Sequence, residues 1–452
     1  MDMQMNKPVS KSIKRFWGVG EFGENFLTTV FSLYFVFFLT DICQLPLSYI
    51  SFILLFTSIA DFTIAPVGGL VIEGTKPMRW GRLRSWILVC PLGIISVFPL
   101  LFLNIESHWI KTVTVVLTFL LYKIISNIGM SANYTMIPTM VTGEKERTIL
   151  ASNRTTGMYT GSALNGYIAP FLLNTFLLVW FGKQWAYLSL GLCAAIVYAA
   201  GYWTHFNLSK GYDLKNTVNP VTKKQKLTIR QMLKVLSTTF PLIPVILVST
   251  TNSFVYFFLP TLAVYYYNNV VEQPSLLSIH MFVAGICAVI GAYSARFIIR
   301  KISVRTACLI IYPVIAIALF STRYVAATPA LFILFSAFAQ LFSAAAPALE
   351  SNFYMDTIAY SEEKTGLKGS AVIMSMTHFV PKLSKLIKNT ILSIMFVSIG
   401  YTAGNTSETV KKGIIDAYSI LPAILLMAGW LLILCFYHLI AQKLKNIKKS
   451  RN

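Results

Sequence analysis

The sequence predicts an all-α polytopic membrane protein with twelve transmembrane helices in two pseudo-symmetric bundles of six. Three observations support this prediction: the composition is strongly apolar, the apolar runs are long enough to span a bilayer, and basic residues fall between those runs. Of the 452 residues, 56% are apolar and only 12% are charged, whereas about 25% are charged in soluble domains. A soluble fold would lack polar surface, so we expect lipid around the chain.

The apolar runs that can cross about 30 Å of hydrocarbon form two sets of six. The first set covers about 16–40, 48–73, 85–104, 110–138, 155–181 and 184–206. The second covers about 237–267, 275–298, 304–322, 328–350, 369–399 and 413–440. We therefore expect an N-terminal bundle over 1–206, a basic cytosolic linker over 207–236, a C-terminal bundle over 237–440 and a basic tail over 441–452.

The positions of the Lys and Arg residues predict the orientation of the chain. Of these 38 residues, 29 fall on the side of the two termini and the linker, and five on the opposite side. The count includes Arg154, assigned to the loop after the fourth span. Basic residues concentrate on the cytosolic side, so we expect both termini in the cytosol and the protein in the cell membrane. This bias explains the net charge of +21 better than a nucleic-acid surface does.

The two halves are similar where the second helix of each half ends. In the first half Gly69 is followed by Arg79, and in the second half Gly291 is followed by Arg296, each at the start of a basic loop. Two six-helix halves joined by a long basic cytosolic loop are typical of the major facilitator fold. This pattern favours a secondary transporter.

A few polar and charged side chains lie within the predicted spans. A charge at membrane depth costs about 2.5–3.5 kcal/mol on insertion scales, so each of these residues is a candidate for a functional role. Those on the first and fourth spans share one helix face each. The candidates for solute binding are Glu21, Glu24, Asn25, Lys123, Asn127, Tyr134 and Lys382, and the candidates for ion coupling are Asp61, Glu24 and His378.

A structural explanation of the same residues stays open. Glu21, Glu24, Asp61 and Lys382 would then form salt bridges without any ligand, because intramembrane ions need partners in either case. Long side chains such as those of Lys385 and Lys388 can extend towards the membrane surface. His378 would be a neutral packing residue, although imidazole also suits proton coupling.

The sequence contains no motif of an enzyme. Gly18, Gly20 and Gly23 resemble part of a nucleotide-binding fingerprint, but no strand precedes them, and small residues in membrane helices usually allow close packing. No phosphate-binding loop, zinc spacing or catalytic triad is evident. We expect a monomer with a small-molecule substrate, no cofactor beyond a coupling H⁺ or Na⁺, no metal site and no nucleic-acid partner.

Several segments resemble the glycoside-pentoside-hexuronide:cation symporters in order and spacing. In the first half these are Trp17–Asn25, Tyr34–Asp41, Ile59–Gly69, Arg79–Leu88, and Ile137–Thr139 with Glu144–Arg147 and Arg154. In the second half they are Met355–Tyr360 and Glu363–Lys368. The resemblance implies the major facilitator fold and cation-coupled transport of a sugar.

The resemblance also implies roles for single residues. The sugar-binding position of the first helix falls on Asn25, with Glu24 before it, and the lysine of the eleventh helix falls on Lys382. The sequence departs from the family at Met130 and Ala65, where two carboxylates are expected. Because Na⁺ needs several oxygen ligands, the loss at Ala65 favours H⁺ as the coupling ion.

The predicted function is therefore a symporter that moves a sugar, glycoside or hexuronide by alternating access. One alternative is a carrier of an anionic or lipid-like solute, since the lysines would suit a carboxylate or phosphate. The other is a membrane sensor that keeps the fold without transporting. The retained intramembrane charges argue against the sensor.

Overall fold

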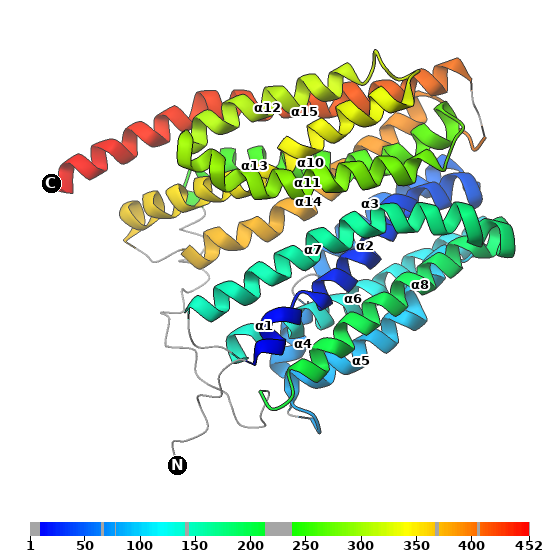
Figure 1. The fold of residues 1–452 in the computed structure, drawn as a ribbon, viewed down its shortest axis with the longest axis horizontal. Coiled ribbons are helices and arrows are strands. Elements are labelled where there is room, and N and C mark those ends of the chain that lie inside the picture. Colours follow the sequence, from blue (N-terminus) through cyan, green and yellow to red (C-terminus); the bar gives the residue numbers. More distant parts are fainter. Residues whose placement is uncertain are drawn as a thin grey trace. The chain divides into compact units, whose positions relative to one another are not determined.

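In the computed structural model, every regular element of the described residues is a helix (Figure 1). The structure describes residues 10–64, 67–76, 78–140, 144–212, 237–366, 370–404 and 407–451. The chain divides into two compact units, unit 1 over Met1–Asn219 and unit 2 over Pro220–Asn452. Most of the expected linker, residues 213–236, lies outside the described residues.

The described part of unit 1 contains six long helical segments, several of them built from two or three elements. The elements are α1 (Lys11–Phe16), α2 (Val19–Phe37), η1 (Phe38–Ile42), α3 (Leu47–Ile64), α4 (Val67–Gly74), α5 (Arg82–Val97), η2 (Phe98–Phe102), α6 (His108–Met140), α7 (Glu144–Leu172), η3 (Leu173–Leu177) and α8 (Leu178–Leu208). These segments coincide with the first six predicted spans. The α7 helix begins eleven residues before its predicted span, because its first turns are polar and hydropathy does not detect them.

The described residues of unit 2 form six further segments, which coincide with the second six predicted spans. The elements are α10 (Leu242–Tyr265), η4 (Tyr266–Val270), α11 (Leu276–Lys301), α12 (Val304–Ser321), α13 (Pro329–Thr365), α14 (Ser370–Ser398) and α15 (Glu408–Arg451). Both α13 and α15 continue past their predicted ends at 350 and 440. The expected tail from residue 441 is therefore a continuation of α15 as far as Arg451.

Ten segments of the described chain are long and apolar enough to cross a membrane. One of them, Thr156–Leu208, contains two predicted spans. Gly182 breaks this segment with φ 66° and ψ 174°, values that glycine tolerates and other residues rarely adopt, and η3 packs back against α8. The α14 helix, which contains Lys382, Lys385 and Lys388, is not among the ten.

The two units repeat one packing scheme. In unit 1, α2 packs against α7 and α8, α5 packs against α6 and α8, and α6 packs against α3 and α4. In unit 2, α10 packs against α14 and α15, α12 packs against α13 and α15, and α13 packs against α11. In both units the first segment contacts the fifth and sixth, the third contacts the fourth and sixth, and the second contacts the fourth. The predicted pseudo-symmetry is confirmed.

Glycines bring the second and fourth segments of each unit into backbone contact. A Cβ atom on Gly68 of α4 would overlap the carbonyl oxygen of Asn127 on α6, and one on Gly291 of α11 would overlap that of Leu341 on α13. In backbone contact, Gly291 corresponds to Gly68 and not to the adjacent Gly69. A Cβ on Gly69 would have no neighbouring atom within 4 Å, since this residue lies on the exposed side of α4.

We predict that Gly68→Ala and Gly291→Ala each lower the stability of the protein by about 1–3 kcal/mol, because the added methyl group forces two backbones apart. The measurement is thermal unfolding of the purified protein in detergent. Gly69→Ala is the matched control and should melt at the wild-type temperature or slightly above it, since alanine favours a helix. Equal melting of Gly68→Ala and Gly69→Ala would contradict this packing.

Candidate functional site

One ion pair within the spanning part of unit 1 joins α3 to α6. The Nζ of Lys123 lies 3.2 Å from the Oδ2 of Asp61, and the two side chains are 14% and 15% exposed. The ammonium group also lies over the rings of Phe119 and Tyr122, at 5.5 Å and 5.3 Å from their centroids, and aromatic faces attract cations. A candidate for ion coupling and a candidate for solute binding are therefore in direct contact.

A second ion pair joins α2 to α7. The Nε of Arg154 lies 3.0 Å from the Oε1 of Glu21, whose side chain is only 6% exposed. The guanidinium group stacks on the ring of Tyr134, with its Cζ 3.7 Å from the ring centroid. Asn133 of α6 donates a longer hydrogen bond to the same Glu21 oxygen, at 3.4 Å. Glu21, Tyr134 and Arg154 thus meet at one place although they come from three helices.

Glu24 is held by hydrogen bonds, and in the described part of unit 1 no Lys or Arg forms an ion pair with it. Ser126 of α6 donates to Oε1 at 3.3 Å, and Tyr202 of α8 donates to Oε2 at 3.1 Å. The residue is 9% exposed. A carboxyl group that is surrounded by hydroxyl donors can exchange one of them for a hydroxyl of a solute.

The structure adds His205 of α8 to this cluster, a residue that the sequence did not single out. The buried imidazole forms two hydrogen bonds of 2.7 Å. Nδ1 bonds with the Oδ1 of Asn133, and Nε2 bonds with the carbonyl oxygen of Trp17. It also stacks on the Trp17 ring, with centroids 4.2 Å apart. A Cβ on Gly20 would overlap this imidazole, so the glycines of the first span serve close packing, as predicted.

The prediction that Arg154 lies in a cytosolic loop was wrong. It lies inside α7, which begins at Glu144. Gly157 contacts the backbone of Gly18, Gly161 contacts that of Phe22, and Asn153 donates to the carbonyl oxygen of Lys14. The spacing of four between residues 153, 157 and 161 is the signal that could have extended the helix, because such residues share one helix face.

Two candidate amides bond to the backbone of their own helices. Asn25 Nδ2 donates to the carbonyl oxygen of Glu21 at 2.9 Å, and Asn127 Nδ2 donates to that of Lys123 at 2.8 Å. Asn25 is half-buried and Asn127 is buried. Each amide therefore sits one turn from a charged member of the cluster.

The remaining candidates belong to α14 of unit 2 or fall outside the described residues. Lys382 is half-buried. Lys385 lies over the ring of Phe257 at 4.7 Å, and Lys388 is 8% exposed. The burial of Lys388 is inconsistent with extension to the membrane surface. The side chain of His378 and the whole of residue Ala65 lie outside the described part of the structure.

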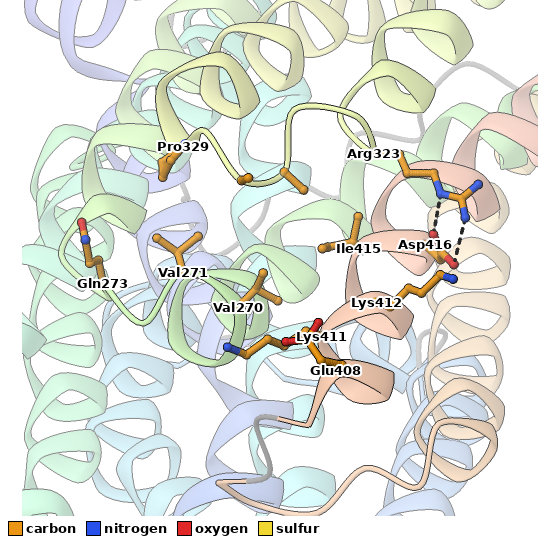
Figure 2. Close-up of a pocket in the computed structure, with 12 residues that line it drawn as sticks. Val270, Val271, Gln273, Arg323, Pro329, Glu408, Lys411, Lys412, Ile415 and Asp416 are labelled. Atoms are coloured by element: carbon orange, nitrogen blue, oxygen red, sulfur yellow. Dashed lines mark hydrogen bonds and ion pairs between the residues drawn. The ribbon is translucent and has the colours of Figure 1, made fainter.

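Unit 2 has a surface recess of about 640 Å³, bordered by η4, the connection from α12 to α13, and the start of α15. Figure 2 draws the residues that line it. On its rim Arg323 pairs with Asp416 at 2.8 Å, while Lys411 pairs with Glu272 at 3.0 Å. The recess lies at the end of unit 2 that the sequence predicts to be extracellular. It contains none of the predicted site residues.

The cluster in unit 1 combines three carboxyl groups with two cationic groups inside helices that can cross a membrane. Glu21 and Asp61 each have a cationic partner, and Glu24 has hydroxyl donors. Such an arrangement can bind the hydroxyl groups of a solute, hold an anionic group, or take up a proton. The fold and these buried charges define a membrane transporter.

The comparisons with known proteins agree with this class. A family model described as MFS/sugar transport protein matches residues 16–440. A proposed 2,3-dihydroxypropane-1-sulfonate exporter of Salmonella typhimurium (strain LT2) is 23% identical over 94% of this chain and 92% of its own length. A proposed sulfoquinovose importer of Escherichia coli (strain K12) is 22% identical over 94% and 90%.

The solved structures support the fold alone. The crystal structure of a D-xylose-proton symporter superimposes with a TM-score of 0.63 at 14% identity, over 92% of this chain and 96% of that one. The chain belongs to the MFS/sugar transport protein family. The prediction of a major facilitator transporter similar to the glycoside symporters is confirmed, and the protein is a membrane transporter rather than an enzyme.

We predict that Lys123→Met destabilises the protein by about 2.5–3.5 kcal/mol, because Asp61 then lies in the membrane without its cationic partner. The double variant Asp61→Asn/Lys123→Met should recover most of this loss. The measurement is thermal unfolding of the three proteins in the same detergent. If the double variant is as unstable as Lys123→Met alone, then Lys123 stabilises the fold through its aromatic contacts and not through the ion pair.

Proposed function

We propose that the protein is a proton-coupled symporter in the cell membrane, with both termini cytosolic, for a sugar or sugar-like solute that carries an anionic group. The observation that carries this proposal is the cluster of paired charges within the spanning helices of unit 1. Charges at this depth are retained where a protein uses them. The predicted excess of basic residues on one side supports the orientation.

The donors of Arg154 support an anionic group on the solute. Its hydrogen bond to Glu21 uses Nε, and the guanidinium group has two further nitrogens that donate in a planar fork suited to carboxylates and sulfonates. The side chain is 24% exposed. Glu24, with its hydroxyl neighbours, would accept from the sugar hydroxyls. Two relatives bear names that denote sulfonated, hydroxyl-bearing solutes, which agrees with this chemistry.

The pair formed by Asp61 and Lys123 supports H⁺ as the coupling ion. Na⁺ needs several oxygen ligands, but the described carboxylate of α3 already faces an ammonium group at 3.2 Å. The residue four positions later in the sequence is Ala65, which offers no side-chain oxygen. A proton needs only one acceptor. Protonation of Asp61 would break its ion pair with Lys123. Because Lys123 belongs to α6, the loss of the ion pair would change how α6 is held against α3.

We predict that purified protein in liposomes accumulates a sulfonated or uronic-acid sugar under an imposed pH gradient, acid outside, and not under an imposed Na⁺ gradient at constant pH. The measurement is uptake of labelled solute, with a neutral hexose or disaccharide in parallel. Accumulation driven by Na⁺ alone would overturn the choice of ion. Transport of the neutral sugar without the anionic one would overturn the choice of solute.

We predict that Asp61→Asn abolishes accumulation driven by the pH gradient, because the variant cannot release a proton at this position. Downhill transport of the solute along its own concentration gradient should remain. Lys123 retains its two aromatic neighbours, so the variant should remain folded. Glu272→Gln is the control, since it removes a carboxylate from an exposed ion pair, and it should transport like the wild type. Undiminished accumulation by a well-folded Asp61→Asn protein would exclude the coupling role.

A further inference from the structure

Unit 2 contains a buried carboxyl group that was not among the predicted site residues and takes no part in the proposed function. Glu350 lies within α13 and is 4% exposed. It sits at the junction where α13 packs against α10 and α12. The predicted span 328–350 placed this residue at the membrane edge, whereas α13 continues for fifteen residues beyond it, to Thr365. Glu350 is therefore inside the helix bundle and not at its end.

The Tyr312 hydroxyl faces two acceptor oxygens but has one hydrogen, so a protonated Glu350 allows one more hydrogen bond at this junction than an ionised one. The hydroxyl oxygen of Tyr312, on α12, lies 2.7 Å from Glu350 Oε1 and 3.2 Å from the carbonyl oxygen of Val248, on α10. A tyrosine hydroxyl has one hydrogen to donate. If Glu350 is protonated, it donates to the Tyr312 oxygen, and Tyr312 donates to Val248. Both short contacts are then hydrogen bonds.

Among the described residues, no neighbour of Glu350 supplies a compensating charge. The titratable side chains that act on it are Tyr312 and Cys308 of α12 and Tyr354 of α13, and α10 contributes the hydroxyl of Ser249. In the described parts of α10, α11, α12 and α14, no Lys, Arg or His forms an ion pair with Glu350. A carboxylate without a cation in such surroundings is strongly disfavoured relative to the neutral acid.

We propose that Glu350 is a proton-binding site of unit 2, which holds a proton while α10, α12 and α13 are packed as in this structure. Loading requires only that the carboxylate takes up one proton from water, and unloading returns it. The neutral acid joins the three helices through Tyr312 and Val248. The ionised form needs water or a cation, so loss of the proton favours an arrangement in which this junction is open. Proton occupancy would therefore bias the conformation of unit 2.

The test is infrared difference spectroscopy of the full-length protein in lipid at neutral pH, with Glu350→Gln and Tyr312→Phe as variants. Glu350→Gln should lose one carbonyl band of a protonated carboxyl group. Tyr312→Phe should keep that band but shift it to higher frequency, because the acid loses its hydrogen-bond acceptor. Glu363→Gln is the control, since Glu363 is exposed on the same helix; it should lose a carboxylate band only.

The proposal is overturned if Glu350→Gln loses a carboxylate band instead, or if the protonated band of the wild type disappears when Na⁺ is added at constant pH. Should Glu350→Gln fail to fold, the shift in Tyr312→Phe decides, and an unshifted band contradicts the proposal. The spectra do not depend on transport. A spectroscopic result that contradicts the role of Glu350 would therefore leave the proposed role of Asp61 untouched. Undiminished coupling in Asp61→Asn, in turn, would concern unit 1 alone.

Discussion

The structure of unit 1 depends on the neutralisation of charge between membrane-spanning helices. Hydrocarbon offers no solvent for an ion, so a charged side chain in a spanning helix constrains both the partner helix and the rotation of its own helix. Asp61 fixes α3 against α6, and Glu21 fixes α2 against α7. Backbone contacts at glycine then set how closely the helices approach. The candidate site is the place where these electrostatic and steric constraints coincide.

The sequence was sufficient to predict the helical segments, including the separation of the spans 155–181 and 184–206, because apolar length is a property of each segment alone. It was also sufficient to find the acids of the first two spans, since charges in apolar runs are rare. It could not predict which side chains they pair with. The partner of Glu21 is Arg154, and that depends on where α7 begins and how it is rotated. Neither property follows from hydropathy.

The same limit explains the residues that were missed. His205 and Glu350 lie near the cytosolic ends predicted for their spans, where polar residues are common and do not attract attention. Their importance follows from burial, which is decided by helices distant in sequence. The sequence also could not show which of Gly68 and Gly69 contacts α6. Two adjacent glycines face different sides of a helix, and a pattern of small residues does not reveal which side is packed.

The contact between Asp61 and Lys123 has a consequence for how the protein is made. The two residues are 62 positions apart, so at about 5–20 residues per second the acid is synthesised roughly 3–12 s before its partner. During that interval the second span would enter the lipid with an unmatched carboxyl group. The span must wait beside the insertion machinery, or enter as the neutral acid, until the fourth span arrives. Biogenesis of the N-terminal half is thereby tied to the order of its helices.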